Sequence, residues 1–220
     1  MTDCKLCGRS KISKIRAAAK TYYHCAHCSL IFIDETGLPG PEAERKRYLE
    51  HHNTHENEGY VKMLTEFLNH LVTPYLQNMD TALDFGCGPT PVLADLLAKR
   101  GLTADVYDPY FYPATTYRMK SYDLITATEV FEHLSDPCRE LRALKDHLNA
   151  GGYLAVRTMF HPGPEKFPGW WYHRDPTHVC FYNSDTFDWI AAHFALRIVF
   201  RDEKKFCLFQ NAGDSSSKDF

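Results

Sequence analysis

Four of the eight cysteines form two C-x-x-C pairs close to the N-terminus. Cys4 and Cys7 are separated from Cys25 and Cys28 by seventeen residues, a spacing typical of a tetrahedral zinc site. Four thiolates fill the coordination shell of zinc and leave no position for water or substrate, so we expect a structural Zn2+ ion. The same pattern favours a reducing compartment over a disulfide framework. Residues 1–36 are therefore expected to form a small zinc ribbon.

A glycine turn is the second feature that could do chemistry, in the sequence LDFGCGP of residues 83–89. No Gly-Lys-Ser/Thr follows it, which excludes a P-loop, and Pro91 stands at the third glycine position of the dinucleotide fingerprint. Asp84 precedes Gly86 by two residues, where its charge would repel a pyrophosphate. Asp108 ends the next expected strand, where an acid can bind ribose hydroxyls. S-adenosylmethionine, which has a ribose and an amino group but no phosphate, fits these residues better than NAD.

Alternating helices and strands must position this turn. Apolar periodicity predicts helices at 60–75, 92–100, 137–148 and 184–194, with a stop at 149–152. Short apolar runs predict strands at 81–85, 103–108, 122–128, 153–159, 196–201 and 206–210. The order predicts an α/β fold, with a Rossmann-like, doubly wound, mostly parallel sheet that ends in a hairpin. The expected organisation is a ribbon at 1–36, a linker and N-terminal helices forming a substrate lid at 37–80, a cofactor-binding domain at 81–212 and a disordered tail at 213–220.

Composition narrows the classes of partner. The net charge of −3 over 220 residues argues against a protein that envelops nucleic acid, and no DNA partner is expected. No apolar run approaches the roughly 20 residues of a membrane span, and no secretion signal is seen, so we expect a cytoplasmic protein without membrane contact. Residues 5–20 carry six Lys or Arg and no acid. This stretch is either a solvated face or a surface for RNA or another acidic partner.

Three motifs in order, LDFGCGP, VYDP and YDLITATEVFEHL, resemble those of class I S-adenosylmethionine-dependent methyltransferases. The resemblance runs from about Tyr60 to Asn211. It implies that the cofactor-binding residues are Asp84, Gly86, Cys87, Gly88, Asp108, Pro109, Thr128 and Glu129. In that family the acid matching Asp84 orients the turn and reaches the methionine amino group, and the acid matching Asp108 bonds both ribose hydroxyls. Glu132 and His133 either line the pocket or serve only as helix, core or capping residues.

The segment between the second and third expected strands departs from the family. Residues 109–121 are too few for the usual helix and strand, so we expect one edge of the sheet to be shortened. The adenine would then lie against Pro109, Tyr110 or Phe111.

The acceptor side is expected to come from two histidine-containing segments, RYLEHHNTHENEGY and FPGWWYHRDPTH. Together with the cysteine pairs, RY-x-x-H-x-N with GY and RDPTHVCFY resemble a group of short bacterial-type methyltransferases over nearly the whole chain. Methyl transfer needs an in-line nucleophile and often a base. The candidate catalytic residues are His178 or His51 as the base, with Arg174 as the contact to an acidic or polar acceptor.

Other readings of these segments stay open. Residues 175–178 can be a structural turn in which His178 bonds to the backbone. Trp170 and Trp171 either stack on a planar acceptor or close the core. The histidines can also form a catalytic metal site.

We therefore expect a methyltransferase that moves a methyl group from S-adenosylmethionine to an oxygen, nitrogen or carbon atom of a small-molecule acceptor. One alternative is an RNA methyltransferase that docks through the basic ribbon. Another is a non-catalytic zinc-binding adaptor that retains the cofactor fold.

Overall fold

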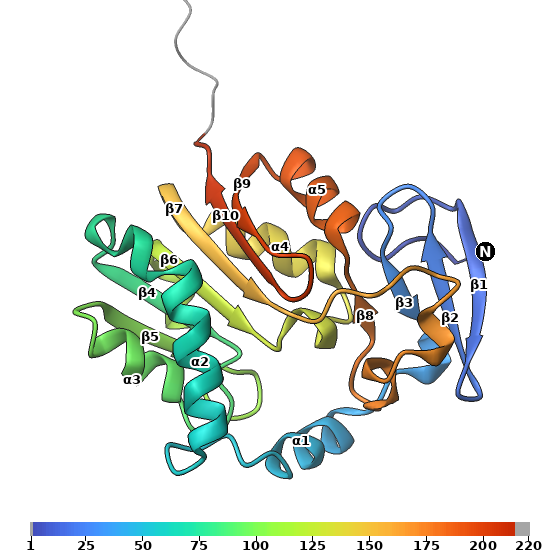
Figure 1. Cartoon of the computed structure of the whole chain (residues 1–220), viewed down its shortest axis with the longest axis horizontal. Helices are drawn as coiled ribbons and strands as arrows, with labels where there is room; N and C mark the ends of the chain where they lie inside the picture. Colours follow the sequence, from blue (N-terminus) through green and yellow to red (C-terminus); the bar gives the residue numbers. More distant parts are fainter. Residues whose placement is uncertain (1, 214–220) are drawn as a thin grey trace, which may run out of the picture.

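A six-stranded sheet forms the centre of the computed structural model, which describes residues 2–213 (Figure 1). Its strands lie in the order β5 (Thr103–Tyr107), β4 (Thr81–Phe85), β6 (Tyr122–Thr128), β7 (Leu148–Arg157), β10 (Phe206–Asn211) and β9 (Leu196–Arg201). The first four are parallel, and β10 is antiparallel to both β7 and β9. This confirms the mostly parallel sheet with a hairpin at one edge. At the other edge β5 is the last strand, as expected from the short segment 109–121.

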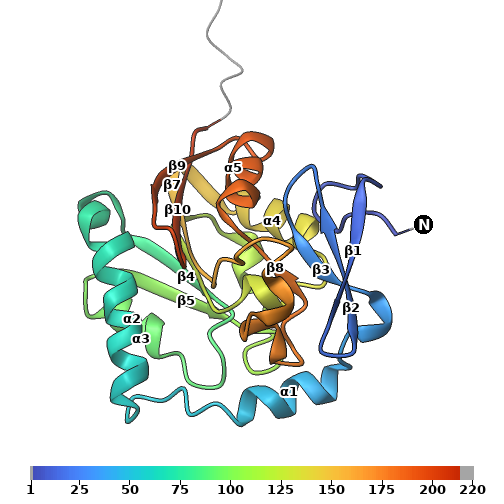
Figure 2. The ribbon, with the colours of Figure 1, turned by 45° about the vertical axis from the view of Figure 1, so that its right-hand side comes forward.

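Helices cover both faces of this sheet (Figure 2). One face packs against α2 (Glu58–Leu71) and α3 (Val92–Ala98), and the other against α4 (Pro137–Asp146) and α5 (Ser184–His193). Neighbouring strand residues alternate between the two cores, since Leu124 belongs to the α2–α3 side and Ile125 to the opposite side. The fold is therefore doubly wound, as the sequence predicts.

Polar side chains cap the first turns of three helices. The Asn57 side chain accepts from the Tyr60 N–H at the start of α2, and Asp136 accepts from the Arg139 N–H at the start of α4. Asn183 and Thr186 form a reciprocal capping box on α5. The predicted stop at 149–152 is wrong, because α4 already ends at Asp146 and β7 runs through these residues with an irregular register against β6.

A second sheet of four strands lies beside the first. It consists of β1 (Ile12–Ala17), β2 (Lys20–Cys25), β3 (Ile31–Ile33) and β8 (Cys180–Phe181), all antiparallel. Its buried Tyr22 and Phe32 belong to the same core as α4 and α5. The N-terminal cysteine segment thus shares a sheet and a core with residues 180–181. Strand β8 was not predicted, because two residues carry no periodic signal.

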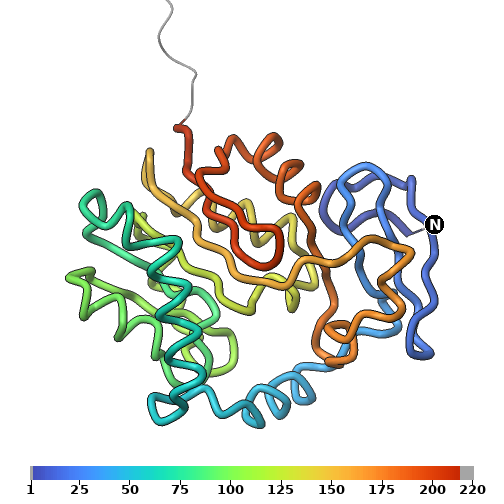
Figure 3. Tube along the Cα trace, in the orientation of Figure 1, coloured from blue at the N-terminus to red at the C-terminus, as the bar shows by residue number. Residues whose placement is uncertain are grey.

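The chain between the two sheets forms a strap that contains α1 (Pro41–Leu49) and leads from β3 to α2 (Figure 3). None of the α1 residues is buried, but Arg47 holds the helix to the loop before β8 through two bonds to the Asp175 carboxylate, at 3.0 and 2.8 Å. Short 3-10 helices occupy Glu35–Gly37, Thr73–Asn78, Thr115–Met119, Phe131–His133, Phe167–Gly169 and Tyr172–Arg174.

The C-terminal tail and the absence of a membrane span were also predicted from the sequence. Apart from Gly213, the tail expected to be disordered lies outside the described residues. Among residues 2–213, every helix falls short of the length and apolar character that a membrane crossing requires.

Candidate functional site

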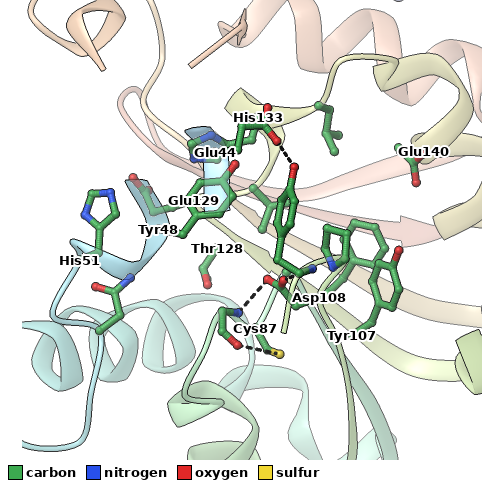
Figure 4. A pocket seen from close by; sticks show the side chains of 18 of the residues that line it. Glu44, Tyr48, His51, Cys87, Tyr107, Asp108, Thr128, Glu129, His133 and Glu140 are labelled. Atoms are coloured by element: carbon green, nitrogen blue, oxygen red, sulfur yellow. Dashed lines mark hydrogen bonds between the residues drawn. The ribbon is translucent and has the colours of Figure 1, made fainter. Parts of the chain in front are cut away.

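A cavity of about 620 Å³ opens at the carboxyl ends of β4, β5 and β6 (Figure 4). This is where open parallel sheets bind their ligands, and the volume is typical of a small-molecule site. Residues of α1 and of the start of α2 form its outer wall, and the glycine turn forms part of its floor. The residues that line it include Glu44, Tyr48, His51, Gly86, Cys87, Gly88, Asp108, Pro109, Tyr110, Thr128, Glu129, Val130, His133, Asp136, Arg139, Glu140, Arg157 and His178.

The turn after β4 presents bare backbone to the cavity. Gly86 and Gly88 adopt φ of +80° and +69°, a region that favours glycine. The N–H groups of Gly86 and Cys87 both donate to the Tyr107 carbonyl, at 2.7 and 3.1 Å, so the turn is fixed to β5. A Cβ on Gly86 would overlap Val130, whereas one on Gly88 would meet no atom within 4 Å. The space above Gly88 is therefore open to a ligand.

Asp84 lies beneath this turn and is 2% exposed. One of its oxygens, Oδ1, accepts from the Thr126 hydroxyl at 3.2 Å, and the other, Oδ2, has no hydrogen-bond partner among the described residues. Burial raises the pKa of Asp84 to about 7. A buried acceptor without a donor is costly in the folded chain. Asp84 is not among the residues that line the cavity, so the charge of a bound ligand would act on it across the glycine turn.

Asp108 stands at the end of β5 and lines the cavity, facing Cys87 (Figure 4). Its carboxylate accepts three backbone N–H bonds, from Gly88 at 3.0 Å, Tyr110 at 2.8 Å and Phe111 at 3.1 Å. These bonds fix the carboxylate against the glycine turn and leave lone pairs for a ligand. Of the residues considered for the adenine, Pro109 and Tyr110 line this cavity. Phe111 faces a separate depression beside β5 instead.

The end of β6 carries an unusual backbone conformation. Glu129 has φ of +54°, which is uncommon for a residue with a side chain and is concentrated at functional sites. Its N–H donates to the Arg157 carbonyl at 2.8 Å, and its carboxylate accepts from Arg157 Nη1. The Tyr172 hydroxyl oxygen lies 3.0 Å from its Oε2, but the single hydrogen of that hydroxyl goes to Glu132. Thr128 and Glu129 both line the cavity. The strained backbone thus directs the Glu129 carboxylate toward Arg157.

Sequence reasoning missed Arg157, the last residue of β7. It lies opposite Thr128 in the parallel ladder and lines the cavity. A signal was present, because Arg157 directly follows the apolar run YLAV at the carboxyl end of a strand, where such sheets place functional side chains. Glu44 and Tyr48 of α1 were also missed. They are four residues apart and so share one helix face, which points to the cavity.

His133 and His178 meet inside the cavity with ring centroids 4.9 Å apart. His133 Nδ1 lies 2.9 Å from the Thr177 carbonyl oxygen, and His178 Nδ1 lies 2.8 Å from the Tyr172 carbonyl oxygen. Burial lowers the pKa of each imidazole to about 4, so both are neutral at pH 7. The Asp175 carboxylate accepts from the Thr177 N–H and hydroxyl. Residues 175–178 therefore form a structural turn that also brings His178 to the cavity.

Other predicted acceptor residues are placed differently. His51 is exposed at the mouth of the cavity (Figure 4), but His55 pairs with Asp95 of α3 at 2.9 Å, outside the cavity. Arg174 is exposed and does not line the cavity, so its expected contact with the acceptor has no support from this cavity. The reason is the 3-10 turn Tyr172–Arg174, which buries its first two side chains and turns the third to solvent. Neither Trp170 nor Trp171 lines the cavity.

The four N-terminal cysteines come together at the end of the small sheet. Their sulfur atoms all lie within 4.8 Å of one another, with 3.4 Å between Cys4 and Cys28 and 3.5 Å between Cys7 and Cys25. Zinc–sulfur bonds of about 2.3 Å in a tetrahedron place sulfur atoms about 3.8 Å apart, which is close to the Cys4–Cys28 and Cys7–Cys25 separations, so the four thiols suit a zinc ion. The arrangement leaves no coordination position facing a cavity.

Comparisons with known proteins agree with this geometry. Residues 49–199 match a family model described as a methyltransferase domain. A search of curated proteins found no match. Among solved structures, an O-methyltransferase family protein from Burkholderia thailandensis is similar at 13% identity and a TM-score of 0.53, over 69% of this chain and 55% of that one. The mitomycin 7-O-methyltransferase is similar at 12% identity and a TM-score of 0.50, over 86% of this chain and 79% of that one. The chain thus spans about half the length of the first of these proteins.

Proposed function

The chain belongs to the methyltransferase-domain family, whose expected cofactor is S-adenosylmethionine, and from this premise we propose that it methylates a small polar acceptor in the cavity behind α1. The observation that carries the proposal is the pair of carboxylates around an open backbone turn. Asp84 has an unpartnered buried oxygen, Asp108 lies on the cavity wall, and Gly88 between them leaves space for a ligand.

The cofactor would lie across the glycine turn. In this placement Asp108 accepts hydrogen bonds from the ribose hydroxyls, and the adenine lies toward Pro109 and Tyr110. The methionine amino group, a cation, would lie on the Asp84 side of the turn, where its charge would stabilise the buried carboxylate. The sulfonium would then lie near Thr128 and Glu129 and face the two buried histidines across the same cavity. Cys87 would contact the cofactor through its backbone, because its side chain is buried.

The lining charges favour a neutral or cationic acceptor over an anionic one. Carboxylates outnumber guanidinium groups on the cavity wall, with Glu44, Asp108, Glu129, Asp136 and Glu140 against Arg139 and Arg157. The phosphodiester backbone of RNA would be repelled by these carboxylates, which disfavours an RNA acceptor. Two solved structures of similar fold are described as O-methyltransferases, and one of them, the mitomycin 7-O-methyltransferase, is named for a small acceptor. His178 or His51 would accept the proton that the acceptor loses on methylation.

The zinc ion is proposed to support the site from a distance. Strand β3 of the ribbon pairs with β8, and Ile33 N–H donates to the Val179 carbonyl at 2.9 Å, one residue after His178. The Tyr22 hydroxyl donates to the His173 carbonyl at 3.3 Å in the same loop. Four zinc-bound thiolates would hold these strands in place, so the ion would position His178 without touching the reactants.

Two measurements test the function. Calorimetry with S-adenosylmethionine and with NAD should give one-to-one binding of the former and none of the latter; binding of NAD alone would refute the cofactor assignment. Incubation of the protein and methyl-labelled cofactor with cell extract, separated into RNA and small-molecule fractions, should label the small-molecule fraction. Label confined to RNA would support docking of RNA through the basic ribbon instead.

A further inference from the structure

Three side chains beside the cavity form a group that the cofactor does not explain: His133 and His178 line the cavity, and Glu132 is fully buried and does not line it. Glu132, His133 and His178 each place one ligand atom within 4.8 Å of the other two. They come from two segments, the 3-10 helix after β6 and the loop before β8, which the chain brings together across 45 residues. Both histidines line the cavity, beside Thr128 and Glu129.

The hydrogen bonds of the two imidazoles leave one nitrogen of each ring free to bind a metal. A carbonyl oxygen only accepts, so the bonds from His133 to Thr177 and from His178 to Tyr172 place the hydrogen of each ring on Nδ1. The Nε2 atom of each ring therefore carries a lone pair. A backbone carbonyl that holds the second ring nitrogen is the usual support of a metal-binding histidine, because it fixes both the tautomer and the ring orientation.

Glu132 completes the group with an unpaired oxygen. Its side chain is fully buried, its Oε1 accepts from the Tyr172 hydroxyl, and its Oε2 has no hydrogen-bond partner in the part of the chain that the structure describes. The nearby Arg157 pairs with Glu129. A buried carboxylate oxygen without donor or cation is expensive, and the imidazole rings beside it, whose Nδ1–H groups are taken by backbone carbonyls, offer it lone pairs and no donor. A cation between the three atoms would satisfy all of them.

We propose that Glu132, His133 and His178 bind a first-row divalent transition ion, which holds a hydroxyl group of the acceptor beside the cofactor. Two imidazoles and one carboxylate suit zinc, cobalt, manganese or iron(II), and three protein ligands leave open coordination positions. The proposal rests on the methyltransferase function, which it narrows to transfer to oxygen. A cation here lowers the pKa of a hydroxyl that it contacts. Because His178 would then be a metal ligand, His51 at the cavity mouth would accept the proton. The acceptor oxygen then forms a bond to the methyl carbon while the carbon–sulfur bond breaks, which yields a methyl ether and S-adenosylhomocysteine.

The test must separate this ion from zinc bound to the cysteines. Zinc-loaded protein is dialysed briefly against a weak chelator and titrated with Co2+, with visible absorption and total metal content measured in parallel. We expect one equivalent of Co2+ to bind without the strong near-ultraviolet charge-transfer band of thiolate ligands, while one zinc per chain is retained. A wild-type protein that binds no Co2+, or binds it only with the thiolate band as zinc is lost, would refute the site.

Variants assign the ligands. His133→Gln and His178→Gln keep a polar side chain of similar size, and each should reduce Co2+ affinity at least tenfold. The matched control is His147→Gln, since His147 also bonds a backbone carbonyl through Nδ1, that of Lys120 at 3.0 Å, but belongs to no ligand group among the described residues. Equal Co2+ binding by all three variants would contradict the assignment.

Calorimetry with S-adenosylmethionine separates the two proposals. Cofactor binding without Co2+ binding removes the ion site and leaves the methyltransferase site intact. Co2+ binding without cofactor binding removes the proposed function, and with it the role given to the ion.

Discussion

The turn at Gly86 offers a direct perturbation of the cofactor site. In Gly86→Ala the new Cβ must accept a φ of +80°, which costs about 1–2 kcal/mol for an L residue. It also overlaps a methyl group of Val130, and overpacking of this kind costs about 1–3 kcal/mol more. We therefore expect the variant to lose about 2–5 kcal/mol of stability. Because the turn or Val130 must move at the cavity wall, the affinity for S-adenosylmethionine should fall at least tenfold.

A variant at a second glycine, Gly101, separates the effect of backbone strain from that of steric overlap. Gly101 has φ of +92°, but a Cβ there would meet no atom within 4 Å, and it lies outside the cavity lining. Gly101→Ala should thus lose only the stability that the positive φ costs an L residue, and its affinity for the cofactor should be unchanged. The two variants should differ in melting temperature by roughly 2–12 °C, from about 2–4 °C per kcal/mol for a chain of this size.

Thermal unfolding and calorimetry on both variants, and on Gly86→Ala combined with Val130→Ala, complete the experiment. Removing the Val130 methyl groups should restore part of the lost stability in a double-mutant cycle. If Gly86→Ala melts like Gly101→Ala and binds the cofactor like the wild type, the geometry assigned to the turn is incorrect.

Three further outcomes are expected. Asp108→Asn should weaken S-adenosylmethionine binding by about 1–3 kcal/mol, or roughly 5–150-fold, through loss of charge-assisted bonds, as measured by calorimetry; unchanged affinity would mean that the ribose lies elsewhere. Because the folded pKa of Asp84 is raised to about 7, its burial should make wild-type stability fall as pH rises from about 4 to 7. Asp84→Asn should remove this pH dependence and be more stable than the wild type at pH 8, by at most about 4 kcal/mol. The same variant should bind the cofactor more weakly. Thermal melts of both proteins at pH 5 and pH 8 show whether the stability difference has the expected sign. Cys25→Ser should lose zinc and melt at lower temperature, and a variant that keeps both the ion and its melting temperature would contradict four-thiolate ligation.

Local sequence signals account for the parts of the site that were predicted. The strand, glycine turn and helix around Gly86 are contiguous, so apolar periodicity and the two glycines place them without tertiary information. Asp108 could be placed because the carboxyl ends of neighbouring parallel strands meet at one edge of the sheet. The cysteine pairs carry their own spacing rule, and the structure brings their sulfur atoms together.

The residues on the acceptor side of the cavity could not be predicted from local sequence patterns. Arg174 was chosen because it lies near His178 in sequence, but the 3-10 turn directs it to solvent, while Arg157 reaches the cavity from β7. Helix α1 has no buried side chain, so its amino acids give no periodic signal, yet Glu44 and Tyr48 line the cavity. Such residues are selected by how segments pack, and only the folded chain reveals them.

A crystal structure of the protein with S-adenosylhomocysteine tests the central claim most directly. The account predicts the ribose hydroxyls within hydrogen-bonding distance of Asp108, the amino group directed to the Asp84 side of the turn, and the sulfur facing His133 and His178. A nucleoside bound away from the Gly86–Gly88 turn, or a diphosphate lying on it, would contradict the account.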